Sequence, residues 1–149
     1  MFKKILFSTF VCLLLVLPAN CETVDAIKQA IIKHSVEMGV EPAMMLSIAK
    51  AESGFRQSAI GGGGTVGVFQ LMPATAKNLG YNPYILEENI KAGITYYKNM
   101  YNMFGKHELA LAAYNSGPVA VKRINCVPQH SQAFVNRVMS DYRYYKTQI

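Results

Sequence analysis

The chain has few cysteines, few acidic residues and no run of basic residues. Of its 149 residues, three are cysteine and nine are aspartate or glutamate, against fifteen lysines and arginines, so the formal net charge is +6. The basic residues are scattered, and no recognisable nucleic-acid-binding motif is present. A modest positive charge favours anionic surfaces such as cell-wall polymers or lipid head groups. Nucleic acid is not expected as a partner.

Several kinds of catalytic site are also missing from the sequence. His34, His107 and His130 stand alone, without the paired spacing of metal ligands, so we expect no metal and no other cofactor. Ser53 lacks a matching histidine and aspartate and does not lie in a nucleophile elbow. A phosphate-binding loop is excluded at Gly61 to Gly64, because no lysine followed by serine or threonine comes after the glycines and no strand precedes them.

Residues 1–21 have the composition of a secretory signal peptide. Two lysines precede an almost unbroken apolar run over residues 5–17, and small residues follow. This run is short for a membrane helix, which needs about 20 residues. We expect cleavage after Cys21, export to the periplasm or beyond, and one mature domain over residues 22–149. Cleavage after Ala19 and lipidation of Cys21 are alternatives, and Asn20 argues against lipidation.

Cysteine pairing depends on this cleavage. Cys12 leaves with the signal in each case, so the mature chain keeps Cys126 alone or together with Cys21. A disulfide between them would suit an oxidising compartment, but separation in sequence does not show whether their Cα atoms can meet. We expect Cys126 to be a buried or partly buried thiol.

The mature sequence predicts an all-α domain with at most a minor hairpin near the glycines. Apolar residues recur at helical spacing in six to seven segments, and no long alternating strand pattern appears. Thr23 can cap the first helix and Gly39 can end it. Pro42 and Pro73 suit the first positions of later helices, and Gly105 suits the end of a long one.

Glu52 is the strongest candidate for a catalytic residue. It follows Met45, Ile48 and Ala49 at helical spacing, so a carboxylate shares the face that this helix would bury. Burial raises the pKa of a carboxyl group because it disfavours the charged form, and a glutamic acid that stays protonated near neutral pH can act as a general acid. The alternative is a glutamate that turns to solvent at a fraying helix end and has no chemical role.

Other polar residues lie near predicted loop mouths and are candidates for ligand binding. An amide at Gln70 could hold a sugar or acetamido group, while the thioether of Met72 packs against it. Tyr114 and Asn115 end a segment of small residues and could hydrogen-bond a ligand. The alternatives are core packing for Met72 and a buried, satisfied hydroxyl for Tyr114. Gly61 to Gly64 could let a polymer approach the backbone or could form a flexible surface loop.

At these residues the sequence resembles the soluble lytic transglycosylase family, whose domain has the goose-type lysozyme-like fold. Four segments match in the family order over about the whole mature chain: Glu52-Ser53, Gly67 to Pro73 with Thr75-Ala76, Asn89-Ile90 with Gly93 and Tyr96, and Ala113 to Pro118. The resemblance implies cleavage of the MurNAc–GlcNAc β-1,4 bond of peptidoglycan without water, which leaves a 1,6-anhydro-muramic end.

By this resemblance Glu52 first protonates the glycosidic oxygen and then, as a carboxylate, takes the proton of the C6 hydroxyl that closes the ring. The residue count agrees, because ordinary glycosidases use two carboxylates and no second acid lies in these motifs. The resemblance also implies that Tyr114 helps to position Glu52. The substrate-binding residues that it implies are Ser53, Gln70, Met72, Tyr114 and Asn115.

The chain departs from its relatives in two places. Many relatives carry a serine nine residues after the glutamate, where this chain has Gly61, so one expected hydrogen bond to the sugar is either missing or made by Ser58. Near the C-terminus, His130-Ser131 stand where relatives often have Glu-Thr. Both departures are expected to affect contacts with the glycan.

Small single-domain members of this family resemble accessory enzymes that open the wall for secretion, pilus or conjugation machinery. We therefore expect glycan strands and components of such a machine as partners of a monomer. Two alternatives remain. One is a lysozyme-like hydrolase that adds water at the same bond, and the other is a catalytically silent peptidoglycan-binding module.

Overall fold

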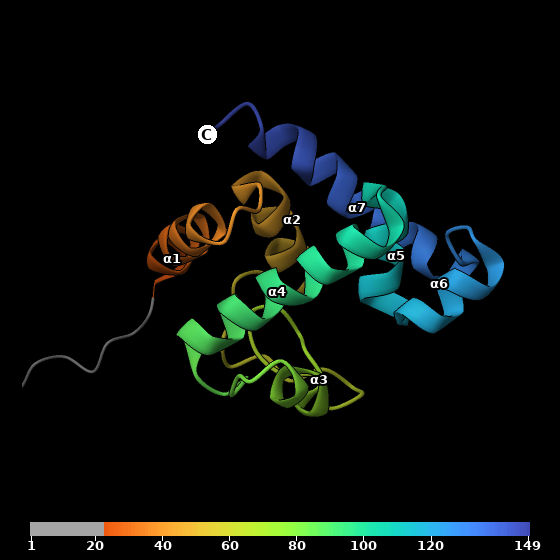
Figure 1. Cartoon of the computed structure of the whole chain (residues 1–149). Coiled ribbons are helices and arrows are strands. Elements are labelled where there is room, and N and C mark those ends of the chain that lie inside the picture. Colours follow the sequence, from red (N-terminus) through yellow and green to blue (C-terminus); the bar gives the residue numbers. More distant parts are fainter. Residues whose placement is uncertain (1–22) are drawn as a thin grey trace, which may run out of the picture.

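The computed structural model describes residues 23–149, and this part of the chain contains seven helices (Figure 1). They are α1 (Val24–Glu37), α2 (Pro42–Ser53), α3 (Pro73–Asn78), α4 (Leu86–Phe104), α5 (His107–Ser116), α6 (Pro118–Ile124) and α7 (Gln129–Tyr145). The only β structure within this part is a pair of isolated bridges, Ile60 to Val66 and Val66 to Leu71. The prediction of an all-α bundle of six to seven helices with at most a minor hairpin is confirmed.

The predicted signal peptide, residues 1–21, and with it Cys21, lies outside the described residues. Across residues 23–149, none of the helices combines the length and the apolar character that crossing a bilayer requires.

The helices begin and end close to the predicted capping residues. The Thr23 hydroxyl accepts the Ala26 N–H at 3.2 Å at the start of α1, which satisfies one of the free N–H groups of the first turn. Pro42 and Pro73 occupy the first positions of α2 and α3, and Gly105 ends α4 with a φ of 67°. Local chemistry therefore accounts for these four boundaries.

Helix α2 is the central element of the bundle. Every residue from Ala43 to Ala49 is buried, because α1 packs on one side of the helix and α7 on another (Figure 1). A helix that is apolar on all faces belongs in a core, so α2 is buried more completely than the predicted single stripe implies. This placement draws its last turn, and with it Glu52, into the molecule.

The loop between α2 and α3 is fastened to α4 by Asn89. The buried Asn89 side chain accepts the Phe69 N–H at 2.9 Å and donates to the carbonyl oxygens of Val66 and Pro83, at 2.9 and 3.0 Å. One turn later Gly93 lets the Phe69 ring approach closely, since a Cβ at this glycine would lie 2.3 Å from the ring. The loop is therefore held in one position against the bundle.

The expectation that Cys126 is buried or partly buried is wrong, because the structure places its side chain in solvent. The residue lies in the bend between α6 and α7, just after Asn125 ends α6 with a left-handed backbone. Pro128, two residues further on, is the part of this bend that is buried.

Candidate active site

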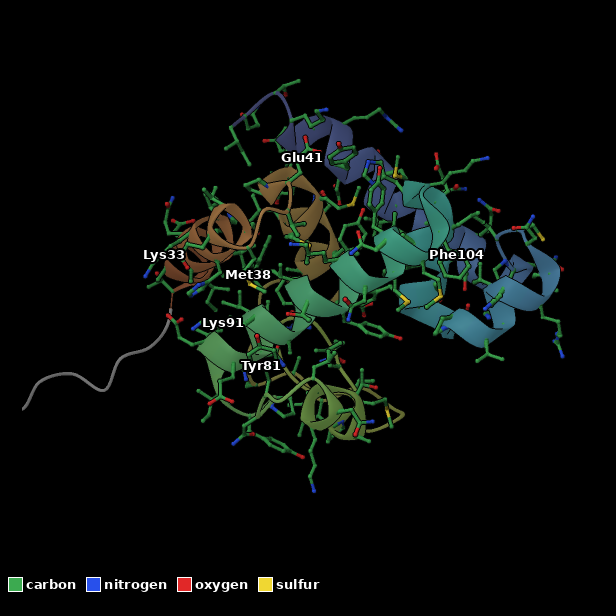
Figure 2. The ribbon with its side chains drawn as sticks, in the orientation of Figure 1. Lys33, Met38, Glu41, Tyr81, Lys91 and Phe104 are labelled. Carbon is green, nitrogen blue, oxygen red and sulfur yellow. The ribbon has the colours of Figure 1, made fainter. Side chains whose placement is uncertain are left out.

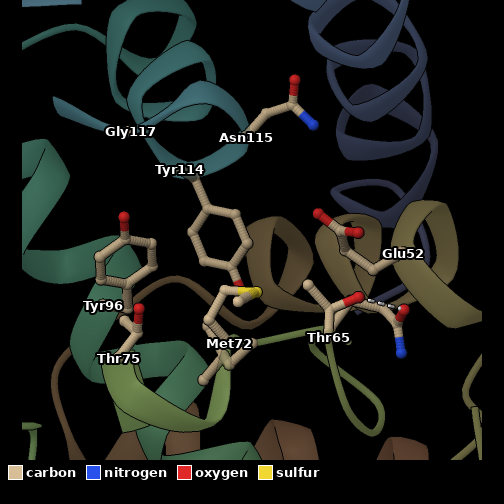
Figure 3. Close-up of a pocket in the computed structure, with 10 residues that line it drawn as sticks. Glu52, Thr65, Met72, Thr75, Tyr96, Tyr114, Asn115 and Gly117 are labelled. Carbon is tan, nitrogen blue, oxygen red and sulfur yellow. Dashed lines mark hydrogen bonds between the residues drawn. The ribbon is translucent and has the colours of Figure 1, made fainter. Parts of the chain in front are cut away.

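A cavity of about 450 Å³ opens beside the C-terminal end of α2 (Figure 3). The loop before α3, the start of α3, the middle of α4 and the C-terminal end of α5 form its walls. Five of the six residues predicted from the sequence line this cavity, and Ser53 does not. The complete lining is Glu52, Thr65, Gln70, Leu71, Met72, Thr75, Tyr96, Tyr114, Asn115 and Gly117.

Glu52 provides the only carboxyl group of the cavity lining. Burial at the end of α2 raises its pKa to about 7, and the positive charge of Arg137 on α7 acts in the opposite direction. Burial has the larger effect, because the cost of removing water from the charged carboxylate exceeds the stabilisation that Arg137 gives to that charge. A large fraction of Glu52 is therefore protonated at neutral pH while its side chain faces the cavity (Figure 3).

Ser53 fastens the chain directly after Glu52. Its buried hydroxyl donates to the Val68 carbonyl oxygen at 2.8 Å and accepts the Arg56 N–H at 3.0 Å. The backbone then reverses through Gly54 and Phe55, whose φ angles are 62° and 64°. In this structure Ser53 joins the end of α2 to the loop that forms the opposite wall.

Gln70 also holds the loop together while it lines the cavity. Its amide nitrogen donates to the carbonyl oxygens of Ala59 and Gly67, at 3.1 and 2.9 Å, and its amide oxygen accepts the Thr65 hydroxyl proton at 2.8 Å. The residue has a φ of 46°, which is uncommon for a residue with a side chain. These three hydrogen bonds stabilise that conformation.

Tyr114 forms a buried part of the cavity wall. Its hydroxyl donates to the Phe69 carbonyl oxygen at 2.9 Å, and its ring lies 5.0 Å from that of Tyr96 between centroids. Burial, followed by the nearby Glu52 and Tyr96, raises the pKa of Tyr114 well above its usual value. The phenol therefore stays neutral and keeps the loop and α5 together next to Glu52.

Met72 and Asn115 are the more exposed members of the lining. Met72 is 46 % exposed at the N-cap of α3, so the alternative of a core-filling methionine does not apply. The Asn115 side-chain oxygen accepts the Ser131 hydroxyl proton at 2.9 Å, which connects α5 to the first turn of α7. Ser131 is one of the two residues that stand where relatives often have Glu-Thr.

The sequence interpretation did not single out Thr65. It noted Leu71, Thr75, Tyr96 and Gly117 only as parts of matching segments and not as lining residues. Threonines in or next to a loop carry no periodic signal, and only the folding of the loop onto α4 brings them to Glu52. Within residues 23–149, no three side chains of histidine, cysteine, aspartate or glutamate gather closely enough to hold a metal ion.

Known proteins support the resemblance seen in the sequence. Residues 29–135 match the family model of the transglycosylase SLT domain. The chain is also 33% identical over 84 residues to a transglycosylase of Enterobacteria phage PRD1, and this match covers 56% of the chain and 32% of the phage protein.

Two solved structures share the fold. A lytic transglycosylase Slt from Pseudomonas aeruginosa, solved as an inactive mutant, superposes with a TM-score of 0.72 at 23% identity, covering 81% of this chain and 24% of that one. The 70 kDa soluble lytic transglycosylase of Escherichia coli superposes with a TM-score of 0.68 at 22% identity. This match covers 82% of the present chain and 26% of that one. The expected lysozyme-like fold is confirmed.

This chain spans about a third of the phage protein and about a quarter of each solved chain. The family model, in contrast, covers most of the present chain, including the end of α2, the whole loop and α5. The chain belongs to the transglycosylase SLT domain family.

Proposed function

We propose that the chain is a peptidoglycan lytic transglycosylase. It cleaves the MurNAc–GlcNAc β-1,4 bond and leaves a 1,6-anhydro-muramic end. The observation that carries this proposal is the lone carboxyl group of Glu52, with a pKa raised to about 7, in a cavity formed by segments typical of the family.

In this mechanism the protonated Glu52 gives its proton to the glycosidic oxygen as the bond from that oxygen to C1 of MurNAc breaks. The C6 hydroxyl of the same sugar then attacks C1, and the Glu52 carboxylate takes the hydroxyl proton. One carboxyl group thus serves first as acid and then as base. The absence of a second acid from the cavity lining argues against the usual pair of glycosidase carboxylates.

The cavity walls provide the groups that would hold the glycan. Asn115 offers an exposed amide, and the exposed Met72 offers an apolar contact. Gln70 shapes the wall through its hydrogen bonds within the loop, and the neutral Tyr114 holds the wall next to Glu52. Ser53 supports the same reaction from outside the cavity by joining Glu52 to the loop. A glycan strand of peptidoglycan is the substrate that this proposal assigns to the cavity.

Digestion of purified peptidoglycan sacculi followed by mass spectrometry tests this proposal. Anhydro ends that are one water lighter than hydrated ends support a lytic transglycosylase. Hydrated ends would indicate a lysozyme-like hydrolase, and folded protein that releases no soluble fragment would indicate a silent binding module.

We further propose that residues 1–21 direct export, without a lipid on Cys21, and that the mature domain acts as a monomer beside a secretion, pilus or conjugation machine. The apolar run at residues 5–17 supports export. Fusion of residues 1–21 to a reporter that is active only outside the cytoplasm tests export. Sedimentation of the mature domain tests the monomeric state. Crosslinking in cells tests the association with components of such a machine.

A further inference from the structure

Thr65 lines the same cavity as Glu52 and comes directly after the four glycines of the loop. It is half-buried and lines the cavity. Figure 3 shows Thr65 below Glu52, and both side chains line the same cavity. The mechanism above gives Thr65 no role.

Hydrogen bonding determines which way the Thr65 hydroxyl points. The Gln70 amide nitrogen faces the carbonyl oxygens of Ala59 and Gly67, and a carbonyl can only accept. This orientation leaves the Gln70 amide oxygen toward Thr65, at 2.8 Å. Because that oxygen is also an acceptor, the Thr65 hydroxyl must supply the proton, and its own oxygen keeps lone pairs for another donor.

Gly61 provides the space for this arrangement. A Cβ at position 61 would lie 2.2 Å from the Thr65 hydroxyl oxygen and 2.7 Å from the Gln70 amide oxygen. The Gly61 N–H donates to the Thr65 carbonyl oxygen at 2.9 Å, and the Gly64 N–H donates to the Gly61 carbonyl oxygen at 2.9 Å. The glycines therefore form a hydrogen-bonded turn at the surface, and Thr65 follows directly after it.

We propose that Thr65 is a further substrate-binding residue, whose hydroxyl oxygen accepts a hydrogen bond from an N–H or O–H group of the sugar bound beside Glu52. This inference rests on the proposed function, because it assumes a glycan in the cavity. It also replaces Ser58 as the candidate for the missing hydroxyl. Ser58 is absent from the cavity lining, whereas the Thr65 oxygen occupies the place that a side chain at position 61 would take.

Five variants test the inference through the rate of cleavage of soluble, uncrosslinked glycan strands. Thr65→Val keeps the shape of the side chain but loses the hydroxyl, and we expect kcat/KM to fall roughly three- to tenfold, the effect of one uncharged hydrogen bond, mainly through KM. Thr65→Ser keeps the hydroxyl, so its kcat/KM should stay close to that of the parent protein. The kcat/KM of Thr65→Ala should fall at least as far as that of Thr65→Val.

The double variant Gly61→Ser with Thr65→Ala moves the hydroxyl to the other side of the turn. Removal of the threonine frees the space that a Cβ at position 61 needs, so we expect this variant to recover most of the activity lost in Thr65→Ala. Gly61→Ser alone should lose activity, because its Cβ collides with Thr65. Thermal unfolding of every variant detects loss of fold.

A Thr65→Val protein within twofold of the parent in kcat/KM would overturn the inference, as would a double variant no better than Thr65→Ala. Binding of the same strands by Glu52→Gln and Glu52→Gln/Thr65→Val proteins gives a second measurement that needs no turnover. Weaker binding by the second protein supports the inference, and equal binding contradicts it. A parent protein that forms no anhydro ends refutes the proposed function, whereas an active parent with an unaffected Thr65→Val refutes only the role of Thr65.

Discussion

The two ends of helix α2 each carry a glutamate, and the two carboxylates have different surroundings. Glu41 lies just before the first turn, close to α7 (Figure 2). It accepts the Tyr142 hydroxyl proton and pairs with the Lys146 ammonium at 3.4 Å. Glu52, in the last turn, is half-buried beside the cavity, and desolvation is the dominant influence on its pKa. The hydrogen bond and the ion pair of Glu41 connect α2 to α7. Burial instead raises the pKa of Glu52, so that this residue can donate a proton near neutral pH.

The largest expected difference between the two ends is catalytic. Glu52→Gln removes the proposed acid and base, so we expect glycan cleavage to fall by roughly 10² to 10⁴-fold. Glu41→Gln is the matched control, because it makes the same change about eleven residues away on the same helix and should keep near-parent activity. Release of anhydro fragments from sacculi measures both variants. Continued release by Glu52→Gln would remove Glu52 from the mechanism.

The second difference is in the pH dependence of the rate. Only the protonated form of Glu52 can donate, so the rate should decline as pH rises through about 7. Arg137 lowers this pKa, and Arg137→Gln should therefore move the decline to higher pH, by less than about one unit because exposed charges are screened. Arg143→Gln, an exposed change on the same helix, is the control. A decline at unchanged pH in Arg137→Gln would contradict the assignment.

The third difference concerns stability. The pKa of Glu52 rises from 4.5 to about 7 on folding, so the folded protein retains a proton that the unfolded chain has lost, and stability falls as pH rises between these values. Glu52→Gln removes this penalty. We expect its free energy of unfolding to exceed that of the parent by about 1–3 kcal/mol near pH 8 and by little near pH 4. Denaturant unfolding at both pH values measures the difference. An equal gain at both would contradict a buried acid.

The smallest expected effect belongs to the N-terminal end of α2. Glu41→Gln weakens a contact whose two charged side chains are 41% and 53% exposed, so we expect a loss of less than about 1 kcal/mol. Added salt should reduce this difference further. Thermal or denaturant unfolding of Glu41→Gln and Lys146→Gln measures it. A loss of several kcal/mol would show that Glu41 is more than a surface connection.

The capping predictions that succeeded depend on chemistry within one helical turn. Thr23, Pro42, Pro73 and Gly105 act on neighbouring backbone groups, so their roles can be predicted without knowledge of distant contacts. Cys126 was predicted wrongly because its exposure depends on how the bend between α6 and α7 meets the core. Composition around a cysteine does not determine that orientation.

Hydroxyl and amide groups in the loop show where prediction from sequence ends. Ser53 stood next to the candidate acid, but its hydroxyl bonds the backbone of residue 68. Thr65 was not predicted as a site residue, but the folded loop places it in the cavity wall. The Gln70 amide reached the cavity as expected, while three hydrogen bonds within the loop occupy it. Each outcome depends on partners between three and fifteen residues away.

The sequence by itself determined the helices, their capping residues, the place of Glu52 on an apolar face and the family to which the chain belongs, because periodicity and short motifs are local properties. Tertiary structure alone decided that α2 is enclosed by its neighbours, which gives Glu52 its raised pKa. It also decided that Asn89 and Gly93 hold the loop against α4. Burial and the partners of polar groups come from residues that meet only when the chain has folded.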